Sequence, residues 1–260
     1  MSHFAALVAR HPRAIIATGL VGLSLEWAVD NYRKYLSLGE GGFPYNPLGW
    51  FMATLATAFS RETLSITEYE SDFSSAVYLD ASKIPERRGS RPTLGWHAIP
   101  HRQVDRLPSP DIREKLVATF NQLALANATF VQLDTSPHER DHQGMLLSSS
   151  VTEPHHVAVR AWREIGHIHP SDSSMHWVLS PADCALVVAK GWGERHPLSG
   201  VSRHCPLPKE YLMIYAPRDE EELSVCEQIM VASMQYMSGT REVSRLSTAD
   251  EAKDGFSYIE

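Results

Sequence analysis

Residues 164–176 read Glu164-Ile165-Gly166-His167-Ile168-His169-Pro170-Ser171-Asp172-Ser173-Ser174-Met175-His176. His167 and His169 are two positions apart, so in an extended segment their side chains point to the same side. The residues from 170 to 174 favour a turn. Such a turn would bring His176 back on the neighbouring strand, beside the other two imidazoles. We therefore expect this segment to gather three histidines on one face of a sheet.

Strands and helices are predicted on both sides of this segment. Runs with the composition of strands occupy 129–133, 144–150, 157–162, 175–179 and 211–215. Ser109-Pro110 and Ser180-Pro181 each place a capping hydroxyl before a proline, which is typical of a helix start. Asp219 is predicted to cap a last helix that ends at Gly239. Strands interrupted by helices at irregular intervals indicate an α+β fold with a largely antiparallel sheet packed with helices.

The buried stripe of the last predicted helix is rich in methionine. Apolar residues recur at helical spacing, and they are Leu223, Cys226, Met230, Met234 and Met237. Three glutamates at the start of this segment suit the positive end of a helix. We interpret the stripe as hydrophobic core rather than as a cofactor site.

The N-terminal region has a different character. Residues 14–25 form an uncharged apolar run, and a second uncharged run covers 43–59. These runs predict an N-terminal hydrophobic helix that serves as a single membrane anchor of an intracellular protein, with the second segment lying against the bilayer. The alternative is that both helices pack on the domain. We divide the chain into a membrane-associated region (1–60), an α+β domain (61–240) and a polar tail (241–260).

Composition excludes several classes of protein. The 260 residues carry a formal net charge of −7, and 43% of them are hydrophobic, which is ordinary for a globular protein. The acidic balance argues against a nucleic-acid partner. The three cysteines are too far apart for a zinc site of the CxxC type and are expected to be reduced thiols. The sequence has no glycine-rich phosphate loop, no GxSxG and no HExxH, so the common nucleotide, hydrolase and zinc-protease functions lack their motifs.

The three histidines of 164–176 allow three interpretations. His167, His169 and His176 could bind a metal ion. They could instead form a metal-free acid–base cluster in which neighbouring imidazoles shift each other's pKa. The third possibility is a purely structural polar network. Two acids lie close in sequence, Glu164 and Asp172.

A second dense segment follows at 190–198, Lys-Gly-Trp-Gly-Glu-Arg-His-Pro-Leu. Its glycines allow a tight loop in which Trp192 could stack on a planar ligand while Arg195 neutralises an anion. The alternative is a packed turn in which Arg195 binds backbone carbonyls. Arg218 is either a second anion clamp or a structural ion-pair partner. His97, which follows Arg91-Pro92, is a weaker candidate.

These blocks together resemble the fungal luciferase family. The resemblance rests on Arg163-Glu164-Ile165-x-His167-x-His169, on His176, on the GWGxRHPL-like segment that contains His196, and on Tyr215-Ala216-Pro217-Arg218. It covers most of the chain. It implies an oxygenase that acts with O2 on a 3-hydroxy-2-pyrone such as 3-hydroxyhispidin, a polyketide-type small molecule, through an enolate and a peroxide. Carbon dioxide is released, with or without light. No organic cofactor is required, and a metal ion is possible.

The resemblance also implies roles for residues. The catalytic set would be His167, His169, His176, Arg195 and His196, and the substrate-binding set would be His97, Trp192, Glu194 and Arg218. Glu164 and Asp172 would orient imidazoles. Two rivals remain: a non-luminescent enzyme of secondary metabolism, such as a metal-dependent oxygenase or a lactone hydrolase, and a non-catalytic, membrane-associated ligand-binding protein.

Overall fold

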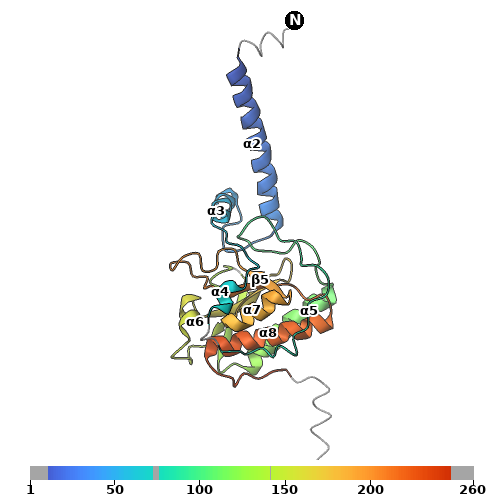
Figure 1. Ribbon diagram of the computed structural model, residues 1–260, viewed down its shortest axis with the longest axis vertical. Helices are drawn as coiled ribbons and strands as arrows, with labels where there is room; N and C mark the ends of the chain where they lie inside the picture. The colour runs from blue at the N-terminus through green and yellow to red at the C-terminus, as the bar shows by residue number, and fades with distance from the viewer. Residues whose placement is uncertain (1–10, 73–75, 141, 247–260) are drawn as a thin grey trace, which may run out of the picture.

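A six-stranded antiparallel sheet lies at the centre of the computed structural model, which describes residues 11–72, 76–140 and 142–246 (Figure 1). The strand order is β1-β2-β3-β4-β6-β5. The strands are β1 (Val131–Thr135), β2 (Gln143–Leu147), β3 (Glu164–Ile168), β4 (Met175–Val178), β5 (Gly193–Arg195) and β6 (Tyr211–Ile214). Every neighbouring pair is antiparallel. The predicted α+β fold with a largely antiparallel sheet is therefore confirmed.

The β3–β4 hairpin sits in the middle of this sheet. His167 pairs with His176, and Gly166 pairs with Trp177. A Cβ atom on Gly166 would lie 2.3 Å from the carbonyl oxygen of His176 and 2.3 Å from the Trp177 ring. Only glycine fits there, so this position holds the two strands in the register that brings the histidines together.

Three helices begin where the capping residues predict. They are α5 (Pro110–Ala126), α7 (Pro181–Ala189) and α8 (Glu220–Ser238). Ser109, Ser180 and Asp219 each accept a hydrogen bond from a backbone N–H of the first turn. Gly239 ends α8 with a φ of 73°, a conformation that glycine adopts without strain.

One predicted strand is wrong. Residues 157–162 contribute to a short helix, α6 (His156–Arg160), which packs on α8. Val157, Ala158 and Ala161 are buried, and this spacing matches a helical face rather than the alternation of a strand. The His155 side chain accepts a hydrogen bond from the Val157 N–H and so caps the helix. Local capping and packing on α8 therefore outweigh the strand-like composition.

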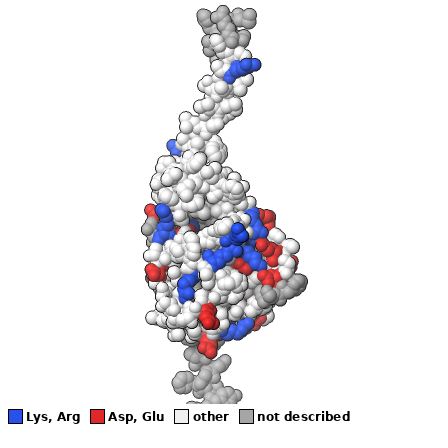
Figure 2. All heavy atoms as spheres, turned by 90° about the vertical axis from the view of Figure 1, so that its left-hand side faces the viewer, with Lys and Arg blue, Asp and Glu red and all other residues white. Residues whose placement is uncertain are grey.

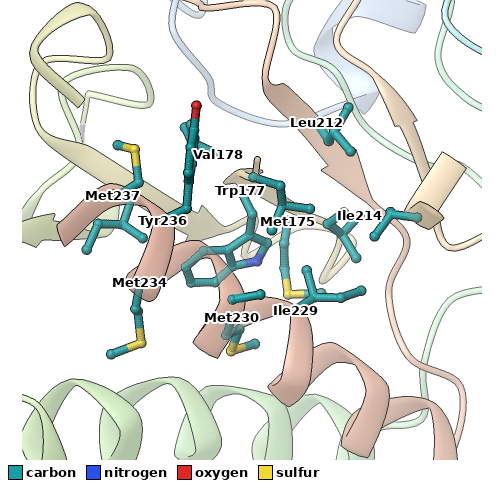
Figure 3. Close-up of a cluster of buried hydrophobic side chains, with 14 of the residues drawn as sticks. Met175, Trp177, Val178, Leu212, Ile214, Ile229, Met230, Met234, Tyr236 and Met237 are labelled. Atoms are coloured by element: carbon teal, nitrogen blue, oxygen red, sulfur yellow. The ribbon is translucent and has the colours of Figure 1, made fainter. Parts of the chain in front are cut away.

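The core between α8 and the sheet contains the predicted methionine stripe. Figure 3 shows the Trp177 ring of β4 next to Met230 and Met234 of α8. The Trp177, Met230 and Met234 side chains are fully buried, as is that of Met237. Burial of each such side chain stabilises the fold by roughly 1.5–3 kcal/mol. This packing fixes the position of the sheet. The histidines lie on the opposite face, because neighbours such as Trp177 and His176 point to opposite sides of a strand.

The N-terminal helix α2 (Pro12–Ser37) projects from the rest of the protein, with α3 (Pro47–Thr57) beside its base (Figure 1). Its C-terminal part contacts the domain through buried Asn31 and Tyr35. Its first half is exposed, including Leu20 and Leu23, and Figure 2 shows few charged side chains along it. The short helix α4 (Thr67–Glu70) follows α3 and packs on α7.

The predicted membrane-spanning anchor is not found among the described residues. Within 11–72, 76–140 and 142–246, none of the helices combines enough length with enough apolar character to cross a bilayer. The physical reason in α2 is that its apolar run stops at Glu26 and is followed by Asp30, Arg33 and Lys34. Residues 247–260 of the predicted polar tail lie outside the described residues.

Candidate functional site

Three buried imidazoles meet at the β3–β4 hairpin. His167 lies in β3, His169 follows the end of β3, and His176 lies in β4. One ring nitrogen from each of the three lies within 4.8 Å of the others, and Nε2 of His167 is 3.2 Å from Nε2 of His169. All three side chains are essentially inaccessible to solvent. The structure thus brings together the three histidines that the sequence pattern placed on one face.

The surroundings of these rings fix which nitrogen of each carries the proton. His167 Nδ1 donates to the carboxylate of Glu164. His176 Nδ1 donates to the backbone carbonyl of Leu212 over 3.1 Å. Because a carboxylate and a carbonyl oxygen can only accept, the neutral form of each ring has its lone pair on Nε2.

His169 is fixed in the same way through a serine. The Ser174 hydroxyl donates its hydrogen to Asp172 over 2.6 Å and lies 2.7 Å from His169 Nδ1. Since that hydroxyl has a single hydrogen, it accepts from His169 Nδ1, and the lone pair of His169 is also on Nε2. Asp172 further accepts the backbone N–H of Gln103. Glu164 and Asp172 therefore orient imidazoles.

A second set of three histidines shares His176 with the first. Nitrogens of His101, His176 and His196 also lie within 4.8 Å of one another. The ring of His101 stacks on that of His176, with centroids 5.6 Å apart. His196 differs in its hydrogen bonding, because its Nδ1 accepts the backbone N–H of Leu198 over 3.1 Å. Neutral His196 therefore carries its proton on Nε2.

This second set borders a cavity of about 350 Å³. The volume falls in the range of roughly 300–1,000 Å³ that is usual for small-molecule sites. The lining is mainly apolar and aromatic, with the imidazoles as its convergent polar groups. The residues around it are Gly42, Phe43, Ile99, His101, Pro137, His138, Glu139, Trp162, His176, His196, Leu198, Cys205, Pro206, Leu207 and Tyr211.

Aromatic side chains form much of the cavity lining. Tyr211 stacks on His176 with centroids 4.7 Å apart, and Trp162 stacks on His138 with centroids 5.1 Å apart. Flat surfaces of this kind favour flat, conjugated ligands. The cavity thus combines stacking surfaces with imidazoles that can exchange protons or donate hydrogen bonds.

Burial keeps the cavity imidazoles neutral. It lowers the pKa of His101 to about 3 and the pKa of His176 and His196 well below the ordinary histidine value. The pKa of His169 is lowered in the same way, because burial penalises the charged ring. Burial alone would raise the pKa of Glu164, but its contacts with His167 outweigh that effect and lower the pKa. Glu164 is therefore ionised at neutral pH.

A buried ion pair supports the cavity wall. Arg102 pairs with Glu139, and both side chains are buried. Burial raises the pKa of Glu139, but the Arg102 charge more than offsets this and brings the pKa to about 2. Arg102 also donates to the carbonyl of Glu40 over 2.8 Å, which ties the segment after α2 to the cavity wall.

Three residues of the 190–198 segment lie elsewhere. Trp192 is buried and donates its indole N–H to the Pro85 carbonyl over 2.7 Å. Glu194 accepts the Tyr215 hydroxyl over 2.6 Å. Arg195 donates to the Ser65 carbonyl over 2.9 Å, as the packed-turn alternative describes. These three side chains are not part of the cavity lining, whereas the next residue, His196, is.

Two further sequence candidates occupy structural positions. Arg218 makes an ion pair with Glu222 four residues later, which is the second of its two sequence interpretations. His97 is buried, and its Nε2 donates to the Asn31 side chain over 3.0 Å. Neither residue lines the cavity.

The sequence patterns did not identify His101 or His138 as site residues. His101 is buried in the cavity wall, and His138 also lines the cavity. His101 lies 75 positions before His176 in the chain, so no local periodicity connects the two. Nothing in the local sequence therefore marked His101 as part of the site.

Comparisons with known proteins agree on one family. The family model described as "Luciferase domain" matches residues 162–233, which contain β3, β4 and His196. The luciferase of Armillaria gallica is 36% identical to this chain over 218 residues, covering 80% of each chain. The luciferase of Neonothopanus nambi is 31% identical over 218 residues, with the same coverage. No solved structure matches this chain.

Proposed function

This chain belongs to the fungal luciferase family, and from that premise we propose that it is an oxygenase that combines O2 with a 3-hydroxy-2-pyrone of the hispidin type. The observation that carries the proposal is the 350 Å³ cavity with buried neutral imidazoles in an aromatic wall. A hydroxypyrone is flat, conjugated and weakly acidic. It therefore matches a site that offers stacking surfaces together with proton acceptors and donors.

The first proposed step is removal of the enol proton. His101 is the candidate base, because it lines the cavity and its Nδ1 has no hydrogen-bond partner among the described residues. The resulting enolate is electron-rich and can reduce O2. A carbon–oxygen bond forms, and the second oxygen atom becomes a peroxide anion. Neutral His196 carries its hydrogen on Nε2 and lines the cavity, where a donor would stabilise the enolate and peroxide oxygens.

The second step closes and breaks a ring. The peroxide anion attacks the lactone carbonyl, and the endoperoxide then loses CO2 as its O–O bond breaks. Both oxygen atoms of the peroxide come from O2, and the enolate supplies the electrons. The reaction therefore needs no organic cofactor. The apolar lining, which includes Leu198 and Leu207, helps to exclude water that would divert the peroxide.

This proposal gives some of the roles that the family resemblance implied to other residues. In this proposal the base and donor roles fall to His101 and His196 at the cavity, and Tyr211 and Trp162 offer aromatic surfaces for a flat ring. Arg195 and Trp192 act outside the cavity in this proposal, because both side chains are engaged by backbone carbonyls. His97 likewise lies outside the cavity lining, where it donates to the Asn31 side chain of α2.

The test is to mix the purified full-length protein with 3-hydroxyhispidin and follow oxygen uptake, CO2 release and light together. Oxygen uptake with CO2 release supports the proposal, and the absence of light would identify a dark oxygenase. Lactone opening without O2 would favour the hydrolase. Tight binding without any turnover of hydroxypyrones would favour a ligand-binding protein.

Two variants sharpen this test. His101→Asn removes the candidate base, and we expect the rate of oxygen uptake to fall roughly 100-fold or more. Trp192→Phe is the matched control, since this buried aromatic lies outside the cavity, and its rate should stay within a few-fold of that of the parent protein. Equal loss in both variants would show that the cavity assignment is wrong.

A further inference from the structure

The hydrogen bonds of the His167–His169–His176 cluster have the pattern of a metal-binding site. All three rings donate Nδ1–H to an acceptor: a carboxylate (Glu164), a carboxylate-bound hydroxyl (Ser174) and a backbone carbonyl (Leu212). Metal-bound histidines almost always donate their second nitrogen in this way, because the acceptor fixes the tautomer and the ring orientation. Here the same arrangement occurs three times around one point.

The consequence is three lone pairs that face a common space. Nε2 of His167 and Nε2 of His169 are 3.2 Å apart, and both carry lone pairs. Two lone pairs at this distance repel unless a proton or a cation lies between them. A single proton could join only two of the nitrogens and would leave His176 without a partner. A metal ion can bind all three.

The neighbouring set is a poorer candidate for the same ion. His101, His176 and His196 are equally close, but His196 Nδ1 accepts the Leu198 N–H. Its Nε2 therefore carries a hydrogen and offers no lone pair in the neutral ring. The hydrogen bonds thus separate two sets that proximity alone does not.

We propose that His167, His169 and His176 bind one divalent first-row transition-metal ion, such as Zn²⁺ or Fe²⁺. Three neutral imidazoles suit such ions, whereas Mg²⁺ and Ca²⁺ require oxygen ligands. The buried Glu164 carboxylate offsets part of the added positive charge. Because His176 also lines the cavity, the ion would lie next to the substrate space. The ion site stands whether or not the proposed pyrone reaction is correct.

The test is metal analysis of the full chain, produced with a tag that contains no histidine. We expect about one equivalent of a transition metal per chain. His167→Asn, His169→Asn and His176→Asn each remove Nε2 while an amide nitrogen can replace Nδ1 as the donor. Each of these variants should lose the metal. His101→Asn and His196→Asn are matched controls from the same buried region, and both should keep it.

Several results would overturn the proposal. One is the absence of bound metal in the parent protein after each of Mn²⁺, Fe²⁺, Co²⁺, Ni²⁺, Cu²⁺ and Zn²⁺ has been supplied. Another is metal loss in the His101 and His196 variants with retention in the His169 variant. If the Asn variants fail to fold, Co²⁺ added to the chelator-treated parent protein decides the matter. A site of this type gives visible d–d absorption that Zn²⁺ abolishes, and the absence of such absorption contradicts it. None of these measurements involves a pyrone, so failure of the proposed function remains distinguishable.

Discussion

His167 and His176 are direct partners across the β3–β4 ladder, and their ring centroids are 5.3 Å apart. His176 also borders the cavity, so its ring connects the buried histidine cluster with the space for a ligand. We therefore expect a substitution in the histidine cluster to affect the cavity, and a substitution in the cavity wall to affect the cluster.

Glu164 should control the metal affinity of the histidine cluster without touching the ion. Glu164→Gln replaces the charged acceptor of His167 Nδ1 with a neutral one, so the ring becomes a weaker ligand. We expect the dissociation constant for the metal to rise roughly 10- to 100-fold, measured by competition with a chelator of known affinity.

Glu194→Gln is the control for this change. Glu194 is also buried, but its carboxylate accepts from Tyr215 outside the cavity. The metal affinity of the Glu194→Gln variant should equal that of the parent protein. Unchanged affinity in Glu164→Gln would show that the orienting role is wrong.

His97 should make the protein less stable in acid. Burial lowers the pKa of His97 to about 4, and an unfolded histidine titrates near 6.5. Between about pH 6.5 and pH 4 the unfolded state therefore binds more protons than the folded state, so stability falls as the pH falls. The contribution of His97 reaches about 1.4 kcal/mol per pH unit within this window.

The measurement is urea unfolding at several pH values in the parent protein and in His97→Gln. Gln can keep the hydrogen bond to Asn31 but does not titrate. The variant should lose stability less steeply between pH 6.5 and 4, and the two curves should run parallel above pH 7.5. Identical slopes across the acid window would contradict the prediction.

The buried Arg102–Glu139 pair should be costly to break. Arg102→Met leaves the Glu139 carboxylate buried without its counter-charge, and we expect a loss of about 3–5 kcal/mol in the free energy of unfolding. Lys115→Met is the control, because Lys115 forms exposed pairs and should contribute less than about 1 kcal/mol. Partial recovery in the double variant Arg102→Met, Glu139→Leu would confirm that the unpaired charge causes the loss.

The methionine stripe of α8 should behave as core. Met234→Ala creates a cavity beside Trp177 (Figure 3), and we expect it to lower the free energy of unfolding by about 2–5 kcal/mol. Leu125→Ala on the exposed face of α5 should change it by less than about 0.5 kcal/mol. Chemical denaturation of both variants at pH 7 provides the comparison, and equal effects would contradict the burial pattern.

Local signals predicted the features that depend on neighbouring residues. Ser109, Ser180 and Asp219 cap helices because a short polar side chain before the first turn satisfies free backbone N–H groups wherever the helix lies. His167 and His169 share one face because they are two positions apart in a strand. The turn after them likewise depends only on residues close in the chain. The strand predicted at 157–162 is wrong, because packing against α8 selects a helix for a segment of ambiguous composition.

The cavity could not be derived in this way. Its wall combines His101, His138 and Tyr211 from separate segments with the β4 histidine. The 190–198 segment illustrates the difficulty, because adjacent residues there serve different surroundings: Arg195 binds the Ser65 carbonyl, whereas His196 faces the cavity. Alternation along a strand separates neighbours in this way, and composition does not reveal which neighbour faces the ligand.

The sequence by itself determined the antiparallel α+β fold, the helix caps, the methionine core of α8 and the meeting of three histidines at one hairpin, because each follows from periodicity or from residues close in the chain. The tertiary structure alone decided which imidazole nitrogens carry protons and which histidines line the cavity. Those properties depend on acceptors such as Leu212 and on His101, which the sheet and its loops bring near from distant positions.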